Sequence, residues 1–441
     1  MKIKILVLLF FYPFLFLSAQ YPKILSQRDQ ARVIDELLED RLVNLLPGLM
    51  KREGIDMWIV ISREYNEDPV IETLLPATWM AARRTTILVM FDKGNQMEYL
   101  AVARYDVGNV FKRAWNPEEQ PDQWARLGKI IEERNPKKIG INKSPDWGHT
   151  DGLTANDFDN LMRVLPKKLQ GNVVSAQKLA VAWLETRSDK EMVIYPQICR
   201  IAHQIIAEGF SDKVIQPGVT TTEDVVWWYR ERIKELKLDT WFHPSVSVQR
   251  NVPDAELSKL PQPVVILPGD LLHVDFGITY LRLNTDTQEH AYVLKPGETD
   301  VPGYLQAAFK KGNRLQDIFT NNFKEGKTGN QVLAESRAQA IAEGITPSIY
   351  THPIGYHGHA AGTTLGMWDM QGGVPGTGDY PLHLNTAYSI ELNCTVRVNE
   401  WNKDVRIALE EDAYFDKSGV WYIDGRQTDI IAIPKPQPHV K

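Results

Sequence analysis

The chain contains little of what would mark it as a disulfide-rich, membrane-spanning or nucleic-acid-binding protein. It has only two cysteines in 441 residues, Cys199 and Cys394, which cannot form a disulfide framework, and we expect two buried free thiols. A formal net charge of −6 gives no sign of binding to nucleic acid or to an anionic membrane. Beyond the N-terminus no apolar run is long enough to cross a bilayer. What remains is a globular composition, and a length that predicts two or three domains.

The N-terminus differs from the rest of the chain because it has a basic, then an apolar, then a small-residue region. Lys2 and Lys4 precede the apolar run at 5–17, and Ser18 and Ala19 follow it. The run is too short for a spanning helix, and a proline interrupts it. This pattern predicts a secretory signal peptide over residues 1–20, with an uncleaved N-terminal anchor as the alternative. We therefore expect a secreted or periplasmic mature protein that is free of the membrane.

Hydrophobic periodicity divides the rest of the chain into two domains. Residues 21–186 have the pattern of a smaller α/β domain, which begins with a helix over 27–52 and ends with a strand over 173–179. A capping box at Ser188 begins the next helix, and residues 187–430 then carry paired helices and hairpin-like strands. This arrangement predicts the α+β class. Residues 431–441 are expected to form an extended tail.

Two aspartates interrupt strand-like apolar runs in the second domain. Asp275 lies in LLHVDFG, and Asp286 follows eleven residues later in LNTDTQEHAYVL. A lone acid inside a β-core is costly unless it is paired or binds a metal. If 274–277 and 284–294 form a hairpin, both carboxylates lie on one face, where a cation would relieve their repulsion. The alternative is a turn acid followed by a capping aspartate.

Two later runs carry glutamates in the same way. Glu391 ends the run AYSIE, and Glu410 and Glu411 lie in VRIALEEDAYF. Strand alternation puts Glu410 on the polar face together with Arg406 and Asp412, so we prefer Glu410 as the site residue. Glu411 stays open as the alternative, because a β-bulge would reverse the choice.

The segment THPIGYHGHAAG, residues 351–362, holds three of the ten histidines: His352, His357 and His359. On its own it could be a chance cluster at a strand end. Added to four strand acids, one imidazole completes an oxygen-rich set that suits two divalent ions. Mn²⁺ is the favoured ion, with Co²⁺ and Zn²⁺ as the other candidates. Two such ions would activate a water molecule near neutral pH.

These motifs resemble the metallopeptidases of the pita-bread fold, family M24, which include methionine aminopeptidase, Xaa-Pro aminopeptidase, prolidase and the metal-free relative creatinase. The chain matches four motifs of the family in order: V-D-F-G followed by a second Asp, H-x-[IL]-G-x-x-x-H, T-[IV]-E, and a last glutamate nine residues before a glycine. The matching residues are Asp275, Asp286, His352 to His359, Ser389 to Glu391, and Glu410 with Gly419. The resemblance covers about 188–430 and extends loosely to 27–185, which is similar to the N-terminal domain of the Xaa-Pro aminopeptidase, prolidase and creatinase branch. It implies a pita-bread catalytic domain after a smaller creatinase-like domain.

The resemblance also implies roles for individual residues. The implied metal ligands are Asp275, Asp286, His352, Glu391 and Glu410. His359 would face the substrate and hydrogen-bond the peptide as charge develops. Glu391 would also carry a proton from the nucleophilic water to the leaving amine. His357 has no role in the family, and we interpret it as structural.

The chain departs from the family near the substrate pocket. The family has another histidine close before the first aspartate, whereas here the nearest ones are His243, well upstream, and His273. We predict His243 as a substrate-binding residue displaced by the inserted stretch at 251–265, with a packing role as the alternative. The usual E-P-G is Glu391-Leu-Asn, and the usual R-I-E is Ala-Leu-Glu410. These changes concern the substrate pocket more than the metal ligands.

The sequence therefore predicts a metallo-aminopeptidase or dipeptidase that hydrolyses the N-terminal peptide bond of peptides, next to proline. Its partners would be a peptide substrate and, as in the family, a second copy of the chain in a homodimer. No nucleic-acid partner is expected. The alternatives are a pita-bread homologue that acts on a non-peptide C–N bond, and a non-catalytic binding protein. The intact ligand set disfavours the binding protein and a metal-free creatinase-like hydrolase.

Overall fold

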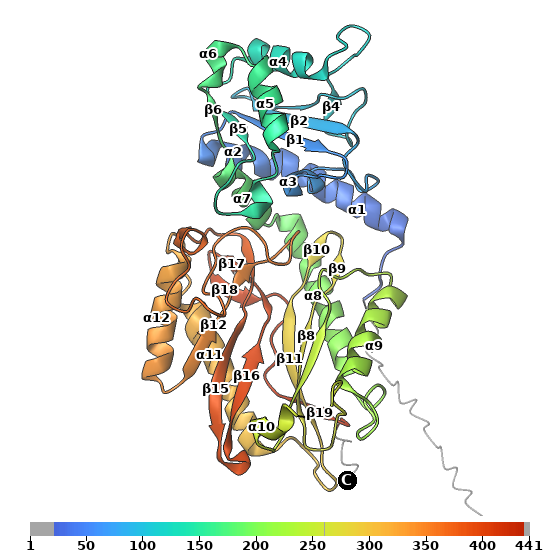
Figure 1. Cartoon of the computed structure of the whole chain (residues 1–441), viewed down its shortest axis with the longest axis vertical. Coiled ribbons are helices and arrows are strands. Elements are labelled where there is room, and N and C mark those ends of the chain that lie inside the picture. The colour runs from blue at the N-terminus through green and yellow to red at the C-terminus, as the bar shows by residue number, and fades with distance from the viewer. Residues whose placement is uncertain (1–21, 260, 436–441) are drawn as a thin grey trace, which may run out of the picture.

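The computed structural model of the chain describes residues 22–259 and 261–435, and it has a smaller domain stacked on a larger one (Figure 1). The predicted signal peptide, residues 1–20, lies outside the described residues. Within them, no helix combines the length and the apolar character that a bilayer crossing requires. Cys199 and Cys394 are both free and buried, as expected.

The N-terminal domain is built around one mixed six-stranded sheet with the order β4-β3-β2-β1-β5-β6. Its central strand is apolar on both faces: Trp58 and Val60 enter one core, and Met57 and Ile59 enter the other. Helices therefore cover both faces of the sheet. The main elements are β1 (Met57–Arg63), β2 (Thr85–Asp92), β3 (Met97–Ala101), β4 (Lys112–Arg113), β5 (Ile139–Ile141), β6 (Val173–Ser175), α1 (Gln27–Asp40), α2 (Leu46–Glu53), α3 (Pro69–Glu72), α4 (Gln123–Arg134), α5 (Ala155–Val164), α6 (Lys167–Gln170) and α7 (Gln177–Glu185).

Two predicted elements of this domain differ from the structure. The strand expected over 173–179 ends at Ser175, and α7 begins at Gln177. The reason is that QKLAVAWLE consists mostly of good helix formers, whose propensity outweighs a short apolar run. The helix expected over 27–52 is divided by a π-helical turn, Arg41–Leu45, between α1 and α2.

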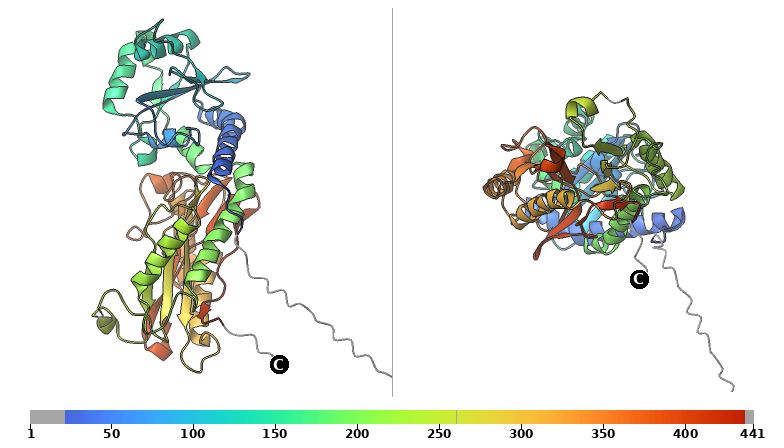
Figure 2. Two further views of the ribbon diagram at one scale, coloured as in Figure 1. Left: turned by 90° about the vertical axis from the view of Figure 1, so that its right-hand side faces the viewer. Right: turned by 90° about the horizontal axis from the view of Figure 1, so that it is seen from below.

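The larger domain has two halves, each a layer of helices against mostly antiparallel strands (Figures 1 and 2). In the first half, α8 and α9 pack on the sheet β19-β11-β8-β7, and in the second, α11 and α12 pack on strands that include β15 and β16. The elements of the first half are α8 (Asp189–Gly209), α9 (Thr222–Glu235), β7 (Ser245–Gln249), α10 (Asp254–Leu257), β8 (Leu271–Phe276), β9 (Thr279–Tyr280), β10 (Leu283–Asn284), β11 (Thr287–Val293) and β19 (Ile431–Ile433). Those of the second are α11 (Gly303–Asn321), α12 (Gly329–Ala342), β12 (Thr346–Ile349), β13 (His352–Pro353), β14 (Thr386–Ser389), β15 (Leu392–Val398), β16 (Lys403–Leu409), β17 (Asp412–Asp416) and β18 (Gly419–Tyr422).

The end of the larger domain differs from the prediction as well. The tail was expected to begin at residue 431, but Ile431–Ile433 form β19 and pair in parallel with Ala291–Val293 of β11. Their apolar side chains enter the core of the first half. The larger domain therefore continues past residue 430, and only the residues after β19 remain candidates for an extended tail.

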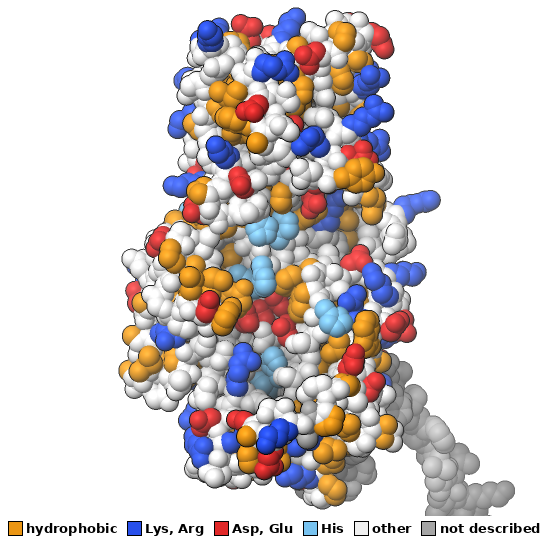
Figure 3. Space-filling model, in the orientation of Figure 1, with side chains coloured by type: hydrophobic (Ala, Val, Ile, Leu, Met, Phe, Trp, Pro, Cys, Tyr) orange, Lys and Arg blue, Asp and Glu red, His pale blue; other side chains and the backbone are white. Residues whose placement is uncertain are grey.

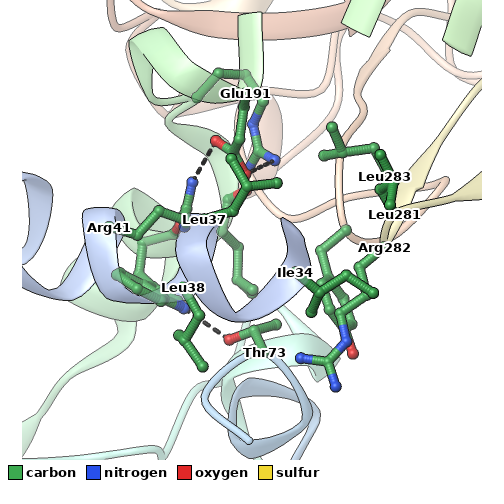
Figure 4. A pocket seen from close by; sticks show the side chains of 13 residues that line it. Ile34, Leu37, Leu38, Arg41, Thr73, Glu191, Leu281, Arg282 and Leu283 are labelled. Carbon is green, nitrogen blue, oxygen red and sulfur yellow. Dashed lines mark hydrogen bonds and ion pairs between the residues drawn. The ribbon is translucent and has the colours of Figure 1, made fainter. Parts of the chain in front are cut away.

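A buried ion network joins the two domains. Glu191 on α8 accepts hydrogen bonds from Arg41 (2.7 Å) and from Arg187 (3.3 Å), which lies between the domains. These groups line a cavity of about 40 Å³ between α1, α8 and the β9–β10 hairpin (Figure 4), which is too small for a peptide. A buried carboxylate shared by two guanidinium groups holds these elements in one relative orientation.

Candidate metal centre

The predicted ligands come from strand ends and strand interruptions of both halves of the larger domain. Asp275 is the penultimate residue of β8, and Asp286 immediately precedes β11. His352 begins β13, while Glu391 and Glu410 lie in the breaks after β14 and β16. Because strict alternation is lost at such breaks, side chains from different strands can turn toward one point. Figure 3 shows acidic and histidine side chains together in a hollow below the N-terminal domain.

The atoms of the five predicted ligands form two overlapping groups that share Glu410, and a third group joins Asp286 and His352 to His359. Asp275, Asp286 and Glu410 each place an oxygen within 4.8 Å of the others, and so do the ligand atoms of His352, Glu391 and Glu410. The Nε2 atom of His352 is 3.7 Å from Asp286 Oδ2 and 3.8 Å from Glu410 Oε1. Two adjoining groups with a common carboxylate are what two neighbouring ions require.

Two buried atoms at the centre of the cluster have no hydrogen-bond partner in the described part of the chain. They are Oδ1 of Asp286 and Nε2 of His352. A buried polar atom without a partner is costly, and an oxygen and an imidazole nitrogen are both good ligands for a divalent cation. The residues present therefore fit a metal centre.

The four carboxyl groups also hold protons more tightly than usual. Burial raises the pKa of Asp275 to about 6 and that of Glu391 to about 7. Burial, followed by the charges of the neighbouring acids, raises the pKa values of Asp286 and Glu410 well above the ordinary range. Closely spaced acids in this state need either protons or cations to neutralise them.

His352 is held in the tautomer that a metal ligand needs. Its Nδ1 atom lies 3.0 Å from the carbonyl oxygen of Pro353, so Nδ1 carries the proton and Nε2 presents a lone pair to the acids. Burial lowers the pKa of His352 to about 3, which keeps the ring neutral.

The model of metallopeptidase family M24 matches residues 195–414. This range includes all five predicted ligands: Asp275, Asp286, His352, Glu391 and Glu410. The chain belongs to this family. No curated protein matches the sequence.

Solved structures of similar fold cover both domains. An X-Pro aminopeptidase from Thermotoga maritima MSB8 is 15% identical, with 87% of this chain and 99% of that chain covered and a TM-score of 0.60. An Xaa-Pro dipeptidase from Bacillus anthracis is 16% identical, with 92% and 100% covered and a TM-score of 0.54. A prolidase from Pyrococcus horikoshii OT3 is 15% identical, with 91% and 100% covered and a TM-score of 0.53. At these identities the likeness concerns the two-domain fold.

The structure places Glu410, rather than Glu411, in the M24 acid cluster. Glu411 turns to the opposite side, where it lies 2.9 Å from His203 Nε2 and accepts from the backbone N–H of Gln427. The other ring nitrogen of His203 contacts Asp424 at 3.1 Å. Burial opposes the charged form, but these two acids raise the pKa of His203 well above its usual value. His203, Glu411, Asp424 and the nearby Glu289 therefore form an ion-pair network apart from the acid cluster. Both ring nitrogens of His203 already have an acidic partner.

His359 lies beside the cluster but more open to solvent than His352. Their ring centroids are 4.6 Å apart and the planes are nearly perpendicular, at 83°. His359 is exposed, and no side-chain hydrogen bond of it is found among the described residues. Trp241 packs against its other side at 5.0 Å. His359 thus adjoins the acid cluster from its open side, and its role toward a substrate stays a prediction.

The structure does not bring His243 into this cluster. Its Nδ1 atom is 3.0 Å from Arg230 Nη1, and its ring packs against Trp227 at 5.4 Å, so its contacts lie on α9. His243 is exposed and precedes β7 by two residues. His243 is therefore not a ligand candidate in this cluster, and its substrate-binding role stays a prediction.

The N-terminal domain contributes a histidine that sequence reasoning missed. The ring of His149 faces that of His357 at 4.6 Å, and burial followed by the nearby His359 lowers the pKa of His149. His357, interpreted as structural, thus lies where the two domains meet, with its buried Nδ1 atom unpartnered within the described structure. No signal in the sequence could have paired His149 with a segment so far along the chain.

Close packing explains the glycine in the histidine segment. A Cβ atom on Gly355 would lie 2.7 Å from the guanidinium carbon of Arg187, which is itself fixed by Glu191. Any larger residue would push the segment that carries His352 and His359 away from the domain junction.

Proposed function

We propose that this M24 peptidase uses two divalent ions to hydrolyse the N-terminal peptide bond of peptides or dipeptides whose second residue is proline. The observation that carries the proposal is the pair of overlapping ligand groups that share Glu410 and surround unpartnered atoms of Asp286 and His352. The preference for proline is supported by the fold likeness to X-Pro aminopeptidases and Xaa-Pro dipeptidases. Mn²⁺ is the proposed ion, because four carboxylates and one imidazole form a mostly hard donor set.

The ligands would be Asp275, Asp286, His352, Glu391 and Glu410. When bound, the ions would supply a water molecule that is nucleophilic near neutral pH and would polarise the scissile carbonyl.

The chain's own residues would move the protons and stabilise the developing charge. The Glu391 carboxylate would accept a proton from the nucleophilic water and then release it to the leaving amine. The imidazole of His359 can donate an N–H to the carbonyl oxygen as negative charge develops there. Burial lowers the pKa of His359, which favours the neutral ring.

A substrate panel with a metal-free and a reconstituted enzyme tests the proposal. Chelated protein should be inactive, and Mn²⁺ should restore cleavage of Xaa-Pro dipeptides or of longer Xaa-Pro peptides. Asp275→Asn, which keeps the shape but not the charge, should lose both bound metal and activity. Fully loaded protein that cleaves none of the peptides would contradict the proposal. Turnover of non-peptide C–N substrates would then favour the alternative hydrolase, and no turnover at all would favour a binding protein.

We also propose that the mature protein is exported and works in the periplasm or outside the cell, and that it forms a homodimer. The basic, apolar and small-residue pattern of residues 1–20 supports export. N-terminal sequencing of the mature protein should give a start at or near Gln20, whereas Met1 on a soluble cytoplasmic protein would contradict export. Light scattering of the purified protein tests the dimer.

A further inference from the structure

Gln288 lies in the middle of the acid cluster, although it is not one of the ligands. It is the second residue of β11, opposite Asp275 on β8, and it forms a backbone bridge with Glu410. Its N–H donates to the Glu410 carbonyl at 3.0 Å, and its side chain is almost fully buried, at 4% exposure. The backbone of β11 thus brings a neutral carboxamide among acids that are expected to bind cations.

The carboxamide of Gln288 contacts two of the predicted ligands and one histidine. Its Nε2 atom donates to Glu391 Oε1 at 2.9 Å and to Glu410 Oε2 at 2.6 Å. Its Oε1 atom lies 2.8 Å from His273 Nε2. An amide nitrogen carries two hydrogens, so one is available for each glutamate.

The environment fixes which way the amide faces. In the reverse orientation the amide oxygen would lie against two carboxylate oxygens, and His273 would face an N–H group. The Nδ1 atom of His273 lies 3.5 Å from the hydroxyl of Ser247, which can donate to it, so Nε2 is free to carry the proton of the ring. With that proton on Nε2, the histidine holds the amide oxygen, and the amide nitrogen must face the glutamates.

This arrangement positions two ligands without neutralising them. A lysine or arginine at the same place would compete with a cation for the carboxylate charges, whereas a neutral amide only fixes their direction. Glu410 is held from its other oxygen by the hydroxyl of Ser389. Because each carboxylate oxygen has more than one lone pair, it can accept these hydrogen bonds and still bind an ion.

We propose that Gln288, oriented by His273, is a positioning residue that holds Glu391 and Glu410 in the geometry required for metal binding. The inference rests on the proposed metal centre and adds to it a residue that touches neither ion nor substrate. Loss of a hydrogen bond that orients a ligand typically weakens metal binding about 10- to 100-fold.

The test is Mn²⁺ titration of the metal-free, full-length mature enzyme by calorimetry. Gln288→Met keeps the length of the side chain but removes its donors, and it should raise the Kd for Mn²⁺ about 10- to 100-fold. Gln249→Met is the matched control: Gln249 also lies on a strand of this sheet, but its amide pairs with the backbone of Arg406 and not with an acid. The control should bind Mn²⁺ like the wild type.

A second variant keeps the test decisive if Gln288→Met does not fold. His273→Phe leaves every ligand and Gln288 in place but frees the amide to rotate, so it should weaken Mn²⁺ binding in the same direction by a smaller factor. If Gln288→Met folds and binds Mn²⁺ with wild-type affinity, the inference is overturned and the proposed metal centre is not. If only His273→Phe folds, wild-type affinity in that variant has the same meaning. An equal loss in Gln249→Met would also overturn it. If the wild type itself bound no Mn²⁺, the proposed function would fail together with the inference.

Discussion

His352 and His359 lie 4.6 Å apart and differ mainly in their surroundings. His352 is buried, with an unpartnered nitrogen directed at the acids, whereas His359 is exposed beside Trp241. Burial favours a fixed ligand, and exposure favours a group that meets the substrate only during turnover.

Alanine variants of the three clustered histidines should therefore behave differently. His352→Ala should lose bound metal and activity together. His359→Ala should keep its metal and lower kcat by about 10² to 10³, with little change in KM, because the contact forms mainly in the transition state. His357→Ala should do neither to a comparable degree. Metal analysis and steady-state kinetics on the three variants check this, and the reverse order of His357 and His359 would show that their roles are exchanged.

At the scale of single residues, sequence reasoning succeeded where the chemistry was unusual. A carboxylate inside an apolar strand is conspicuous, so Asp275 and Asp286 could be singled out from the sequence, and the structure brings them together. Gln288 and His149 gave no such signal. A glutamine in a strand and a histidine in a turn are ordinary, and only their distances to other elements make them noteworthy.

The break between β16 and β17 determines which of two adjacent glutamates reaches the cluster. β16 ends at Leu409 and β17 begins at Asp412, so Glu410 and Glu411 are free to turn to opposite sides. Glu410 joins the ligands, and Glu411 joins His203. Alternation along the strand gave the preference for Glu410, but the break itself was not predicted.

Isosteric variants of the two glutamates should separate metal binding from stability. Glu410→Gln should lose metal binding, because the one carboxylate that both ligand groups share would lose its negative charge. Glu411→Gln should retain metal but lower the free energy of unfolding by about 2 kcal/mol, since a buried charged hydrogen bond to His203 is lost. Mn²⁺ titration and urea unfolding of both variants measure the two effects. Metal loss in Glu411→Gln with retention in Glu410→Gln would exchange the assignments.

At the scale of elements, capping signals were more reliable than short apolar runs. The box at Ser188 begins α8 as predicted, because the reciprocal side-chain and backbone bonds with Glu191 form locally. The run at 173–179 and the chain end at 431 were misjudged, because helix propensity and pairing with β11 decided them.

The whole molecule has a buried acid where its two domains meet. Glu185 ends α7 and is fully buried; its Oε1 accepts from Tyr380, and its Oε2 has no hydrogen-bond partner within the described residues. Burial raises its pKa from the ordinary 4.5 to about 8, although Arg52 lies 3.9 Å away. The folded protein therefore binds a proton here that the unfolded chain releases at lower pH.

Stability should consequently fall as the pH rises from about 4.5 to about 8. In this window the folded state holds more protons than the unfolded state, so the free energy of unfolding decreases with pH. The variant Glu185→Gln is neutral at this position at every pH. Its free energy of unfolding, measured relative to that of the wild type, should therefore be higher at pH 8 than at pH 5, by on the order of 2 kcal/mol. Urea unfolding at both pH values measures this, with the exposed Glu118→Gln as a control. Parallel pH profiles of wild type and Glu185→Gln would contradict it.

The two-domain organisation could be predicted because the resemblance covered both parts of the chain. How the domains meet could not, since the contacts between them join residues with no pattern in common. Examples are the hydrogen bonds from Trp147 to the Gly362 carbonyl and from Tyr356 to the Glu72 carbonyl, each 3.0 Å.

These hydrogen bonds have a consequence for how quickly activity can appear after unfolding. Each closes a very long stretch of chain: 284 residues separate Tyr356 from Glu72, and 215 separate Trp147 from Gly362. Helices and hairpins form early because their contacts are local. The histidine segment, residues 351–362, contacts the N-terminal domain only after the two folded domains have docked. On refolding, peptidase activity should therefore return later than the far-ultraviolet circular dichroism signal, with a rate set by the docking of the domains.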